Sequence, residues 1–506
     1  MDEQSLVLRM LPMNLANALI DAFQRHPEKA AIYWGGEIIT YSQIVEESDW
    51  IRNYLLKECQ VNPGDRVALW MKNTPEFISI LYGVLRAGAV VVPLNHFLTA
   101  PEAELILRDS GAKVIFVDDA MYKGANCMRE VLPEVNLCHI KNLSAGPSET
   151  EQIMHTASVK DEDDLALIIY TSGTTGRSKG AMLTHGNLAH NVNSCVKTMR
   201  VSETDKIVLL LPMFHSFMVT VAILLPIKVG GSIVLIQSLH PPKNILQEII
   251  AAEATILPAI PPFYRAFASS SLPQLPLRLC ISGAAPLPRE VLKKFNRQSN
   301  MSLIESYGLS EASPVVTLNP VDGPWKAGSI GLPIHDVAVA IMNEQGQEVP
   351  TGQTGELWVK GGNVMKGYWN RPEASAEALC HGWLRTGDMG HVDEEGYIYV
   401  TDRKKDMLLV NGINVYPREI EELIYECEGV KEVSVVGQID QRKGELPVAF
   451  IVMEDGCNQN THAILEALKP RLAAYKIPRK ILFIGKLPRN ATGKVLKTVL
   501  RKQLRA

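Results

Sequence analysis

The sequence lacks the cysteine and histidine patterns of a disulfide framework or of a zinc site. Its eight cysteines are scattered along 506 residues, no two of them form a C-x-x-C pair, and several lie in apolar runs. Such cysteines are typical of reduced, buried thiols, so we expect a cytoplasmic protein. The twelve histidines include no H-E-x-x-H motif and no cluster, which argues against a zinc ion held by the protein.

A strong excess of charge is also missing. The chain has 51 lysines and arginines against 55 aspartates and glutamates, a formal net charge of −4. This balance gives no support for nucleic-acid binding, and we expect no nucleic-acid partner. The first residues are acidic rather than basic, so we expect no secretory signal.

One long run without charged residues extends from position 208 to position 226. Its length is that of a membrane span, but Pro212, His215 and Ser216 interrupt it, and a second apolar run follows at 227–236. We therefore predict a strand, a loop, a buried helix and another strand, and no transmembrane segment.

The order of apolar runs predicts an α/β fold with more than one domain. Strand-like runs alternate with helix-like segments over the first four fifths of the chain, which is typical of mainly parallel sheets covered by helices. Residues 322–400 consist of short runs split by glycines and predict a β-rich subdomain. We expect an N-terminal domain at 1–402 that includes this subdomain, and a small α+β C-terminal domain at 403–506.

The segment "YTSGTTGRSKGA", residues 170–181, is rich in glycine and hydroxyl groups and follows the apolar run "LALIIY". Glycines allow close approach of the backbone to a ligand, and exposed N–H groups, hydroxyls and one lysine form a concave anion site. A Walker A loop would need glycine where Ser178 stands. The pattern indicates a phosphate loop of another kind, and a flexible connector is the structural alternative.

Other polar segments stand between apolar runs. "CISGAAPLP" at 280–288 and "LIESYGLSEASP" at 303–314 place small residues at predicted strand ends, where α/β sheets bind ligands. Asp388, Arg403 and Lys494 lie in similar polar breaks. Taken singly, they also fit a turn aspartate, a surface charge and a solvated lysine.

Taken together, these motifs resemble the superfamily of acyl-adenylate-forming (ANL) enzymes, and most closely its medium- and long-chain fatty acid–CoA ligases. The resemblance covers essentially the whole chain. It rests on "YTSGTTGRSKGAMLTHGNL", "YGLSE", "GELWVKG", "GYWNRPE", "WLRTGD", "DRKKDMLLVNGINVYPREIEE" and "PRNATGKVLK". It implies that a carboxylate attacks ATP to give an acyl adenylate and pyrophosphate, and that coenzyme A then displaces AMP.

The resemblance also implies roles for individual residues. Lys494 would draw the carboxylate and the α-phosphate together as a catalytic residue, and Glu311, also catalytic, would hold Mg²⁺. Asp388 and Arg403 would bind the ribose, and the loop from Thr171 to Lys179 the β- and γ-phosphates. The implied ATP- and AMP-binding residues are Thr171, Ser172, Gly173, Thr174, Thr175, Gly176, Lys179, Gly283, Ala284, Ala285, Glu305, Ser306, Tyr307, Gly308, Ser310, Asp388, Arg403 and Lys494.

The resemblance implies a mobile C-terminal domain that rotates between the two half-reactions. Lys405 falls at the hinge, and Asn411, Gly412 and Asn414 would line the channel for the pantetheine arm of coenzyme A. No carrier domain follows Ala506, so we expect free coenzyme A as the acceptor. The final helix is basic, and peripheral contact with a membrane is left open, as is a homodimer.

The acid is expected to be uncharged beyond its carboxylate. Amino-acid-activating relatives carry an aspartate after the phenylalanine of "PMFHSF", whereas His215 stands there in this chain. An α-amino acid would then bury an unpaired ammonium, at a cost of several kcal/mol. We predict a fatty acid that contacts His215, Phe217, Met218 and Val219.

Three alternatives to a fatty acid–CoA ligase stay open on the sequence. The first is a ligase for an aryl or other carboxylic acid, such as coumarate. The second is a non-catalytic protein that binds acyl chains or adenylates, although Glu311, Asp388, Arg403 and Lys494 are all present. The third is a luciferase-like oxidation.

Overall fold

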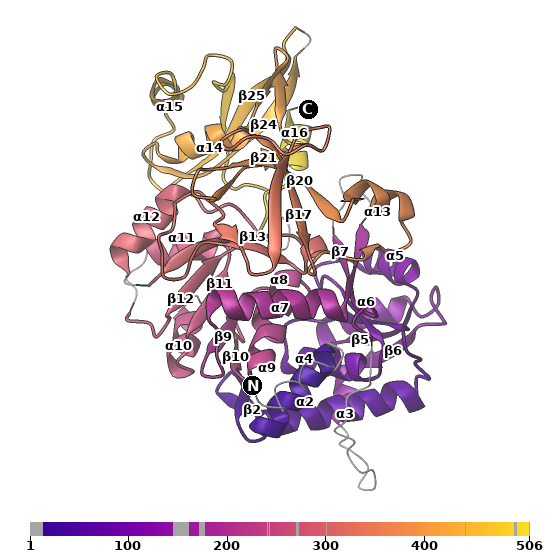
Figure 1. The fold of residues 1–506 in the computed structure, drawn as a ribbon. Coiled ribbons are helices and arrows are strands. Elements are labelled where there is room, and N and C mark those ends of the chain that lie inside the picture. Colours follow the sequence, from indigo (N-terminus) through magenta and orange to yellow (C-terminus); the bar gives the residue numbers. More distant parts are fainter. Residues whose placement is uncertain are drawn as a thin grey trace.

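The computed structural model describes residues 14–144, 161–171, 178–239, 241, 243–269, 273–299, 301–440, 442–489 and 493–504. Within these ranges the strands form four sheets. Two large sheets lie side by side in the lower part of Figure 1, and two smaller ones lie above them.

The first large sheet has seven strands in the order β18-β8-β7-β4-β3-β5-β6. The five strands from β7 to β6 in this order are parallel, and β8 and β18 are antiparallel additions at one edge. The strands are β3 (Arg66–Trp70), β4 (Val90–Pro93), β5 (Ala112–Val117), β6 (Asn136–His139), β7 (Leu165–Thr171), β8 (Lys179–Thr184) and β18 (Gly367–Tyr368).

The second large sheet has nine strands in the order β15-β14-β13-β12-β11-β9-β10-β1-β2. Its six central strands are parallel, and β2, β14 and β15 are antiparallel. The strands are β1 (Ala30–Trp34), β2 (Glu37–Thr40), β9 (Lys206–Leu209), β10 (Ser232–Leu235), β11 (Ile256–Ala259), β12 (Leu279–Ser282), β13 (Leu303–Gly308), β14 (Val315–Leu318) and β15 (Leu332–Pro333).

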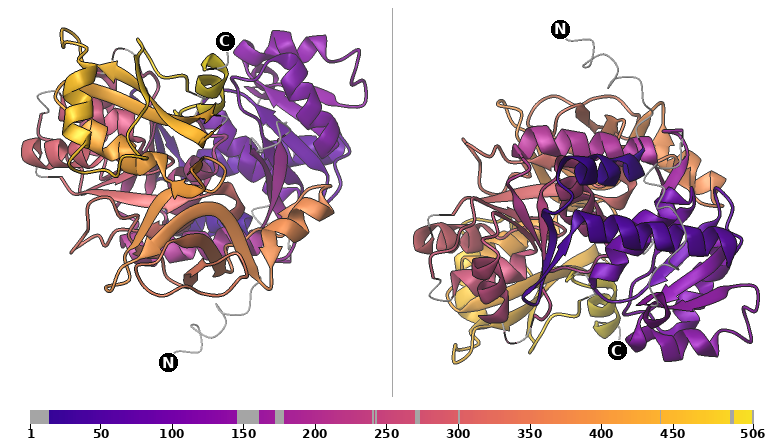
Figure 2. Two further views of the ribbon diagram at one scale, coloured as in Figure 1. Left: turned by 90° about the horizontal axis from the view of Figure 1, so that it is seen from above. Right: turned by 90° about the horizontal axis from the view of Figure 1, so that it is seen from below.

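Helices pack between and around these two sheets (Figures 1 and 2). One hydrophobic core includes residues of both sheets and of the helices α2, α4, α7 and α9. The helices of this part are α2 (Leu15–Arg25), α3 (Tyr41–Lys57), α4 (Pro75–Arg86), α5 (Ala100–Ser110), α6 (Asp119–Cys127), η1 (Ile140–Ser144), α7 (His185–Met199), α8 (Ser216–Met218), η2 (Val219–Leu224), α9 (Leu225–Val229), α10 (Lys243–Ala251), α11 (Pro261–Ala268), α12 (Arg289–Gln298) and η3 (Ser310–Ala312).

The uncharged run at 208–226 is part of this core. It comprises the end of β9, a loop, and the buried helix α8–η2–α9, whose middle section is a π-helix, and β10 follows. The prediction of strand, loop, buried helix and strand is confirmed. In the described part of the chain, no helix is both long and apolar enough to cross a membrane.

The two smaller sheets follow in the chain. The first has the order β16-β17-β20-β19, with β21 paired to β20. The second has the order β23-β22-β25-β24, with β26 parallel to β25. Their elements are β16 (Val337–Met342), β17 (Gly355–Gly361), α13 (Pro372–Ala378), β19 (Leu379–Cys380), β20 (Trp383–Val392), β21 (Ile398–Arg403), β22 (Leu408–Val410), β23 (Ile413–Val415), α14 (Pro417–Tyr425), β24 (Val430–Asp440), β25 (Gly444–Met453), α15 (Thr461–Leu468), β26 (Lys480–Phe483) and α16 (Lys497–Gln503).

The last sheet has hydrophobic cores of its own. One includes Leu408, Ile420 and Ala449, and another includes Val436, Phe450 and Leu500. The expected α/β fold, with mainly parallel large sheets, a β-rich section and a terminal α+β section, is confirmed.

Candidate active site

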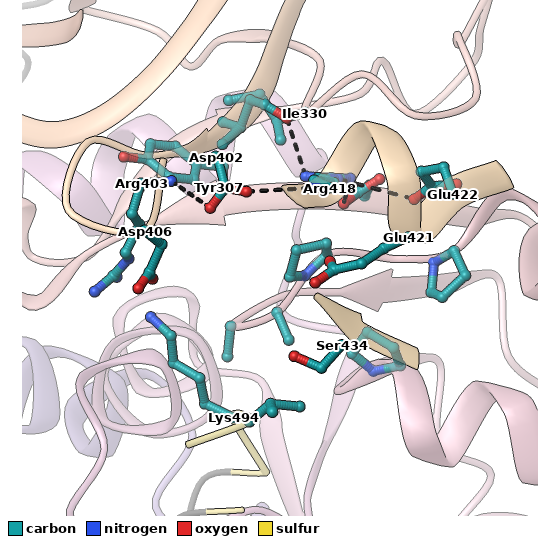
Figure 3. A pocket seen from close by; sticks show the side chains of 18 of the residues that line it. Tyr307, Ile330, Asp402, Arg403, Asp406, Arg418, Glu421, Glu422, Ser434 and Lys494 are labelled. Carbon is teal, nitrogen blue, oxygen red and sulfur yellow. Dashed lines mark hydrogen bonds and ion pairs between the residues drawn. The ribbon is translucent and has the colours of Figure 1, made fainter. Parts of the chain in front are cut away.

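A cavity of about 250 Å³ lies where the ends of β12 and β13 meet β20, β21, α14 and the loop before α16 (Figure 3). Most parts of the chain predicted to bind nucleotide contribute to its wall. The predicted residues that line it are Ala284, Ala285, Glu305, Ser306, Tyr307, Gly308, Asp388, Arg403 and Lys494. Gly283 directly precedes the first of these, after the end of β12.

Asp388 and Arg403 form an anchored ion pair on this wall. They are directly opposite each other on β20 and β21, and Arg403 Nε lies 3.3 Å from Asp388 Oδ1. The hydroxyl of Tyr307 donates to Asp388 Oδ2 at 2.5 Å. Burial and the charge of Asp388 raise the pKa of Tyr307, which keeps this hydroxyl protonated as a donor. A carboxylate and a guanidinium are thus held at fixed positions beside the cavity.

Two buried polar atoms on the cavity wall lack a protein partner. Glu305 Oε1 accepts the backbone N–H of Leu287 at 3.0 Å, but Glu305 Oε2 has no hydrogen-bond partner among the described residues. The same holds for Ser434 Oγ, which β24 contributes to the wall of the same cavity. Burial raises the pKa of Glu305 to about 7. Because buried polar atoms are normally paired, these two indicate a ligand with hydrogen-bonding groups.

Lys494 reaches into the cavity from the loop before α16. Figure 3 shows its side chain extending toward Arg403 and Asp406. Burial, together with the positive charge of Arg403, lowers the pKa of Lys494 to about 8, although Asp388 opposes this shift. Burial, with the charge of Lys494, also lowers the pKa of His215 to about 4. His215 is therefore neutral at neutral pH, and its Nδ1 accepts the N–H of Phe217 at 3.2 Å.

Glu311 and Lys179 are connected through Tyr368. The hydroxyl of Tyr368 donates to Glu311 Oε1 at 2.9 Å, and the ammonium of Lys179 lies 5.1 Å from the centre of the Tyr368 ring. Ser310 Oγ lies 3.0 Å from Ser216 Oγ. The described end of the predicted phosphate loop and the predicted metal ligand are thus close together.

The middle of that loop lies outside the described residues. This applies to Ser172, Gly173, Thr174, Thr175 and Gly176. At the start of the loop, Thr171 Oγ1 donates to the carbonyl of Lys179 at 3.4 Å. Within the described ranges, no group of three or more histidine, cysteine, aspartate or glutamate side chains gathers as a metal site.

The four residues predicted to contact the acyl chain lie at different depths. His215 is near Lys494, and the ring of Phe217 packs against Gly283, where an added Cβ would lie 3.2 Å from Phe217 Cζ. Phe217 also lines an apolar void of about 10 Å³. None of the four lines the large cavity, and Met218 and Val219 are fully buried in the core. The π-helix that starts at Val219 is a feature often found beside functional sites.

The predicted hinge and channel residues are not in the cavity wall. Lys405 is exposed in the turn after β21. Asn411 and Gly412 form the exposed turn between β22 and β23, with φ of 53° and 77°, and Asn414 is exposed on β23. Among the described residues, the cavity therefore gathers the predicted adenine- and ribose-binding residues and Lys494, but not Thr171, Lys179, Ser310 or the predicted coenzyme A residues.

Several residues of the site were missed by the sequence analysis. Arg418 begins α14 beside Glu305, at 3.9 Å, and the hydroxyl of Ser434 faces the same cavity. Tyr368 lies within the motif "GYWNRPE". This motif indicated that the segment matters, but it did not indicate which residues Tyr368 contacts. Arg418 follows Pro417 at a predicted helix start, where a charged residue is usually exposed to solvent, so the sequence contained no signal for its role.

The fold and this cavity are those of an adenylate-forming enzyme: strand ends, an anchored carboxylate–guanidinium pair and a buried lysine converge at one cavity. The chain belongs to the AMP-binding enzyme family. The family description "AMP-binding enzyme" matches residues 19–369, and "AMP-binding enzyme C-terminal domain" matches residues 419–494. The protein is an AMP-forming acid–thiol ligase of the acyl-adenylate-forming superfamily.

Its relatives include ligases for different acids. The chain is 35% identical over 526 residues to a long-chain-fatty-acid–CoA ligase of Bacillus subtilis, covering 96% of this chain and 93% of that protein. It is 36% identical over 485 residues to a feruloyl-CoA synthase of Amycolatopsis, covering 94% and 96%. The structure resembles that of ATP-bound MatB from Rhodopseudomonas palustris with a TM-score of 0.90 and 33% identity, covering 97% and 99%. The acyl-CoA ligase class is thus established, and the acid differs between relatives.

Proposed function

We propose that the protein activates a fatty acid. In the first half-reaction the fatty carboxylate attacks the α-phosphate of ATP, which gives acyl-AMP and pyrophosphate. In the second, the thiol of coenzyme A attacks the acyl carbonyl and AMP leaves. The observation that carries the proposal is the segment 215–219, which has no charged group beside Lys494: His215 is neutral, and Phe217 lines an apolar void. The printed name of the Bacillus relative supports the same substrate class.

The geometry of the cavity supports the following nucleotide contacts as part of this proposal. Asp388 accepts hydrogen bonds from the ribose hydroxyls, and Arg403 donates to the same sugar. The backbone after β12 and the residues 305–308 flank the adenine. The unpartnered oxygens of Glu305 and Ser434 accept from donors on the nucleotide. The loop from Thr171 to Lys179 holds the β- and γ-phosphates.

Mg²⁺ would be held by Glu311, whose carboxylate oxygens suit this ion, and would supply positive charge to the phosphate oxygens. The hydroxyl of Tyr368 orients this carboxylate. Lys494 reduces the repulsion between the carboxylate of the acid and the α-phosphate, because its ammonium faces both. The neutral His215 adds no charge that would repel Lys494.

In this proposal the chain divides into a domain at 1–402, with a β-rich subdomain at 322–400, and a mobile domain at 403–506. Lys405 is the hinge, and rotation about it exchanges Lys494 for Asn411, Gly412 and Asn414 at the cavity. The final basic helix is available for the phosphates of coenzyme A. The cytoplasmic location, membrane contact and a homodimer stay predictions.

The rate of adenylation is expected to fall at alkaline pH. The pKa of Lys494 is lowered to about 8, so its ammonium form is present below this pKa and is lost as the pH rises through it. We expect kcat/KM for adenylation to fall about tenfold per pH unit above about pH 8. Because bound anions favour the ammonium, kcat should fall at a higher pH than kcat/KM. Both kcat and kcat/KM are measured by ATP–pyrophosphate exchange in the presence of the carboxylic acid substrate. A rate that stays constant up to about pH 10 would contradict the role of the Lys494 ammonium in adenylation.

A panel of acids tests the proposed substrate. Each buried methylene contributes up to about 0.8 kcal/mol, so kcat/KM should rise severalfold per two-carbon step and continue to rise beyond about eight carbons. Pyrophosphate release and thioester formation are measured from acetate to oleate, with benzoate, coumarate and ferulate as aryl acids. A maximum at acetate or at an aryl acid would replace the fatty acid by another substrate and leave the class of reaction unchanged.

An aryl acid is the second candidate. It is supported by the printed name of the Amycolatopsis relative and by the position of Phe217, whose ring lines a small apolar void and packs against Gly283. A flat aryl acid needs less depth than a fatty chain, and the same panel distinguishes the two. The absence of exchange with every acid would instead favour a binding protein without catalysis.

A further inference from the structure

Glu432 on β24 joins two arginines from distant parts of the chain. Its Oε1 lies 3.3 Å from Nη1 of Arg265, which belongs to α11, and 3.0 Å from Nη2 of Arg489, which follows β26. The three side chains are largely buried, with exposed fractions of 17% for Arg265, 16% for Glu432 and 26% for Arg489. At such burial an ion pair is screened less than at the surface.

Arg489 also holds the loop that carries Lys494. Its Nη1 donates to the carbonyl of Gly493 at 2.5 Å, and its backbone forms an isolated antiparallel bridge with Val495. The residues on both sides of Lys494 are thus tied to Arg489. A shift of the Arg489 guanidinium would therefore move the base of the lysine side chain.

Helix α11 provides the surface against which this loop lies. Gly493 has a φ of 81°, and a Cβ added to it would lie 2.7 Å from Cδ1 of Ile260, the residue that caps α11. About a turn and a half further along, Arg265 contacts Glu432 and also lies 5.6 Å from the centre of the Tyr425 ring. One short helix therefore contacts both the loop and the strand that supports it.

We propose that Arg265, Glu432 and Arg489 form a clamp that positions Lys494 for adenylation, with Glu432 as its central positioning residue. Only the activity measurement that tests this clamp rests on the proposed function. Glu432 touches neither substrate nor reacting atoms in this assignment. It acts through Arg489 and the carbonyl of Gly493, and it ties the loop to α11 through Arg265. Without its carboxylate, two partly buried guanidinium groups would lose the negative charge that lies between them.

The test compares both half-reactions in the full-length Glu432→Gln variant. We expect kcat of acid-dependent ATP–pyrophosphate exchange to fall by roughly 10- to 100-fold, because a displacement of about 1 Å at a reacting group has effects of this size. The KM for ATP and thioester formation from supplied acyl adenylate should change little. Glu432→Asp, which keeps the charge, should recover most of the exchange rate. The matched control is Glu466→Gln, which breaks the exposed pair with Lys469 on α15 and should change neither reaction.

A double variant and a structural readout complete the test. If the three residues act as a unit, Arg265→Met combined with Glu432→Gln should be no slower than Glu432→Gln alone. Hydrogen–deuterium exchange at residues 486–496 should become faster in Glu432→Gln, but not in Glu466→Gln. Equal losses in both half-reactions, losses that multiply in the double variant, or unchanged hydrogen exchange would overturn the clamp. If the unmodified enzyme activates no acid, the proposed function fails, and hydrogen exchange still decides the clamp.

Discussion

Lys494→Ala is expected to reduce acyl-adenylate formation by roughly 10³-fold or more, the size of effect that cationic groups have in phosphoryl transfer. The ammonium is needed while the carboxylate and the α-phosphate approach each other, and the structure places it in the cavity beside Arg403 and Asp388. Thioester formation from supplied acyl adenylate should be nearly unaffected, because no second anion has to be brought in. The two half-reactions are measured separately, by ATP–pyrophosphate exchange and by acyl-CoA release.

The control for this variant is Lys480→Ala, which removes an exposed lysine from β26 and should leave both rates unchanged. An equal loss of both half-reactions in Lys494→Ala would mean that the lysine supports the structure of the loop. Since Lys494 is partly buried and its pKa is lowered, its removal should not lower the melting temperature.

Lys405→Pro should stop the second half-reaction while the first continues. Lys405 is exposed in the turn after β21, and a rotation at this point requires a change of its backbone dihedral angles. Proline fixes φ near −65° and prevents that change. Acyl adenylate should therefore form in a single burst and accumulate on the enzyme, and steady-state acyl-CoA production should fall by about 10²-fold or more. Rapid quenching with labelled ATP measures the burst.

The variant Lys405→Ala distinguishes the effect of a restricted backbone from the effect of the lost charge. It removes the same ammonium but leaves φ free, so its turnover should be close to that of the unmodified enzyme. A folded Lys405→Pro enzyme with normal turnover would contradict the hinge, and equal losses in both variants would assign the effect to the lysine charge.

Local patterns were sufficient to predict the layers of the fold. The alternation of apolar runs predicted the parallel strands β3, β4 and β5 with the helices between them, because each run has to bury one face. The uncharged run at 208–226 was likewise predicted as a buried helix after a strand. The glycine-rich segment at 170–181 predicted a loop, but not that β8 returns antiparallel to β7 at the sheet edge, since hairpin pairing depends on register.

The contacts between distant residues were not predictable in the same way. Motifs drew attention to Asp388 and Arg403, but only the register of β20 against β21 places them opposite each other. Arg265 and Glu432 are far apart in the sequence, and each reads as a surface charge in its own segment. Their meeting depends on how α11 and β24 pack, which no local periodicity encodes. Ser434 lies in an apolar strand pattern, and this pattern does not indicate that its hydroxyl lines the cavity, because that also depends on how β24 packs.

The separate cores of the last sheet have a thermodynamic consequence. Because Leu408, Ile420 and Val436 pack among residues of their own section, this section can change its position without exposing its core. Contacts that would have to break include the buried ion pairs of Arg418 with Glu305 and of Arg265 with Glu432. A movement of the whole section would return both partners of each pair to water, so the hydration of the separated charges would offset much of the lost attraction. Under the proposed rotation, a ligand in the cavity would then shift the populations of the two arrangements by its difference in affinity for them.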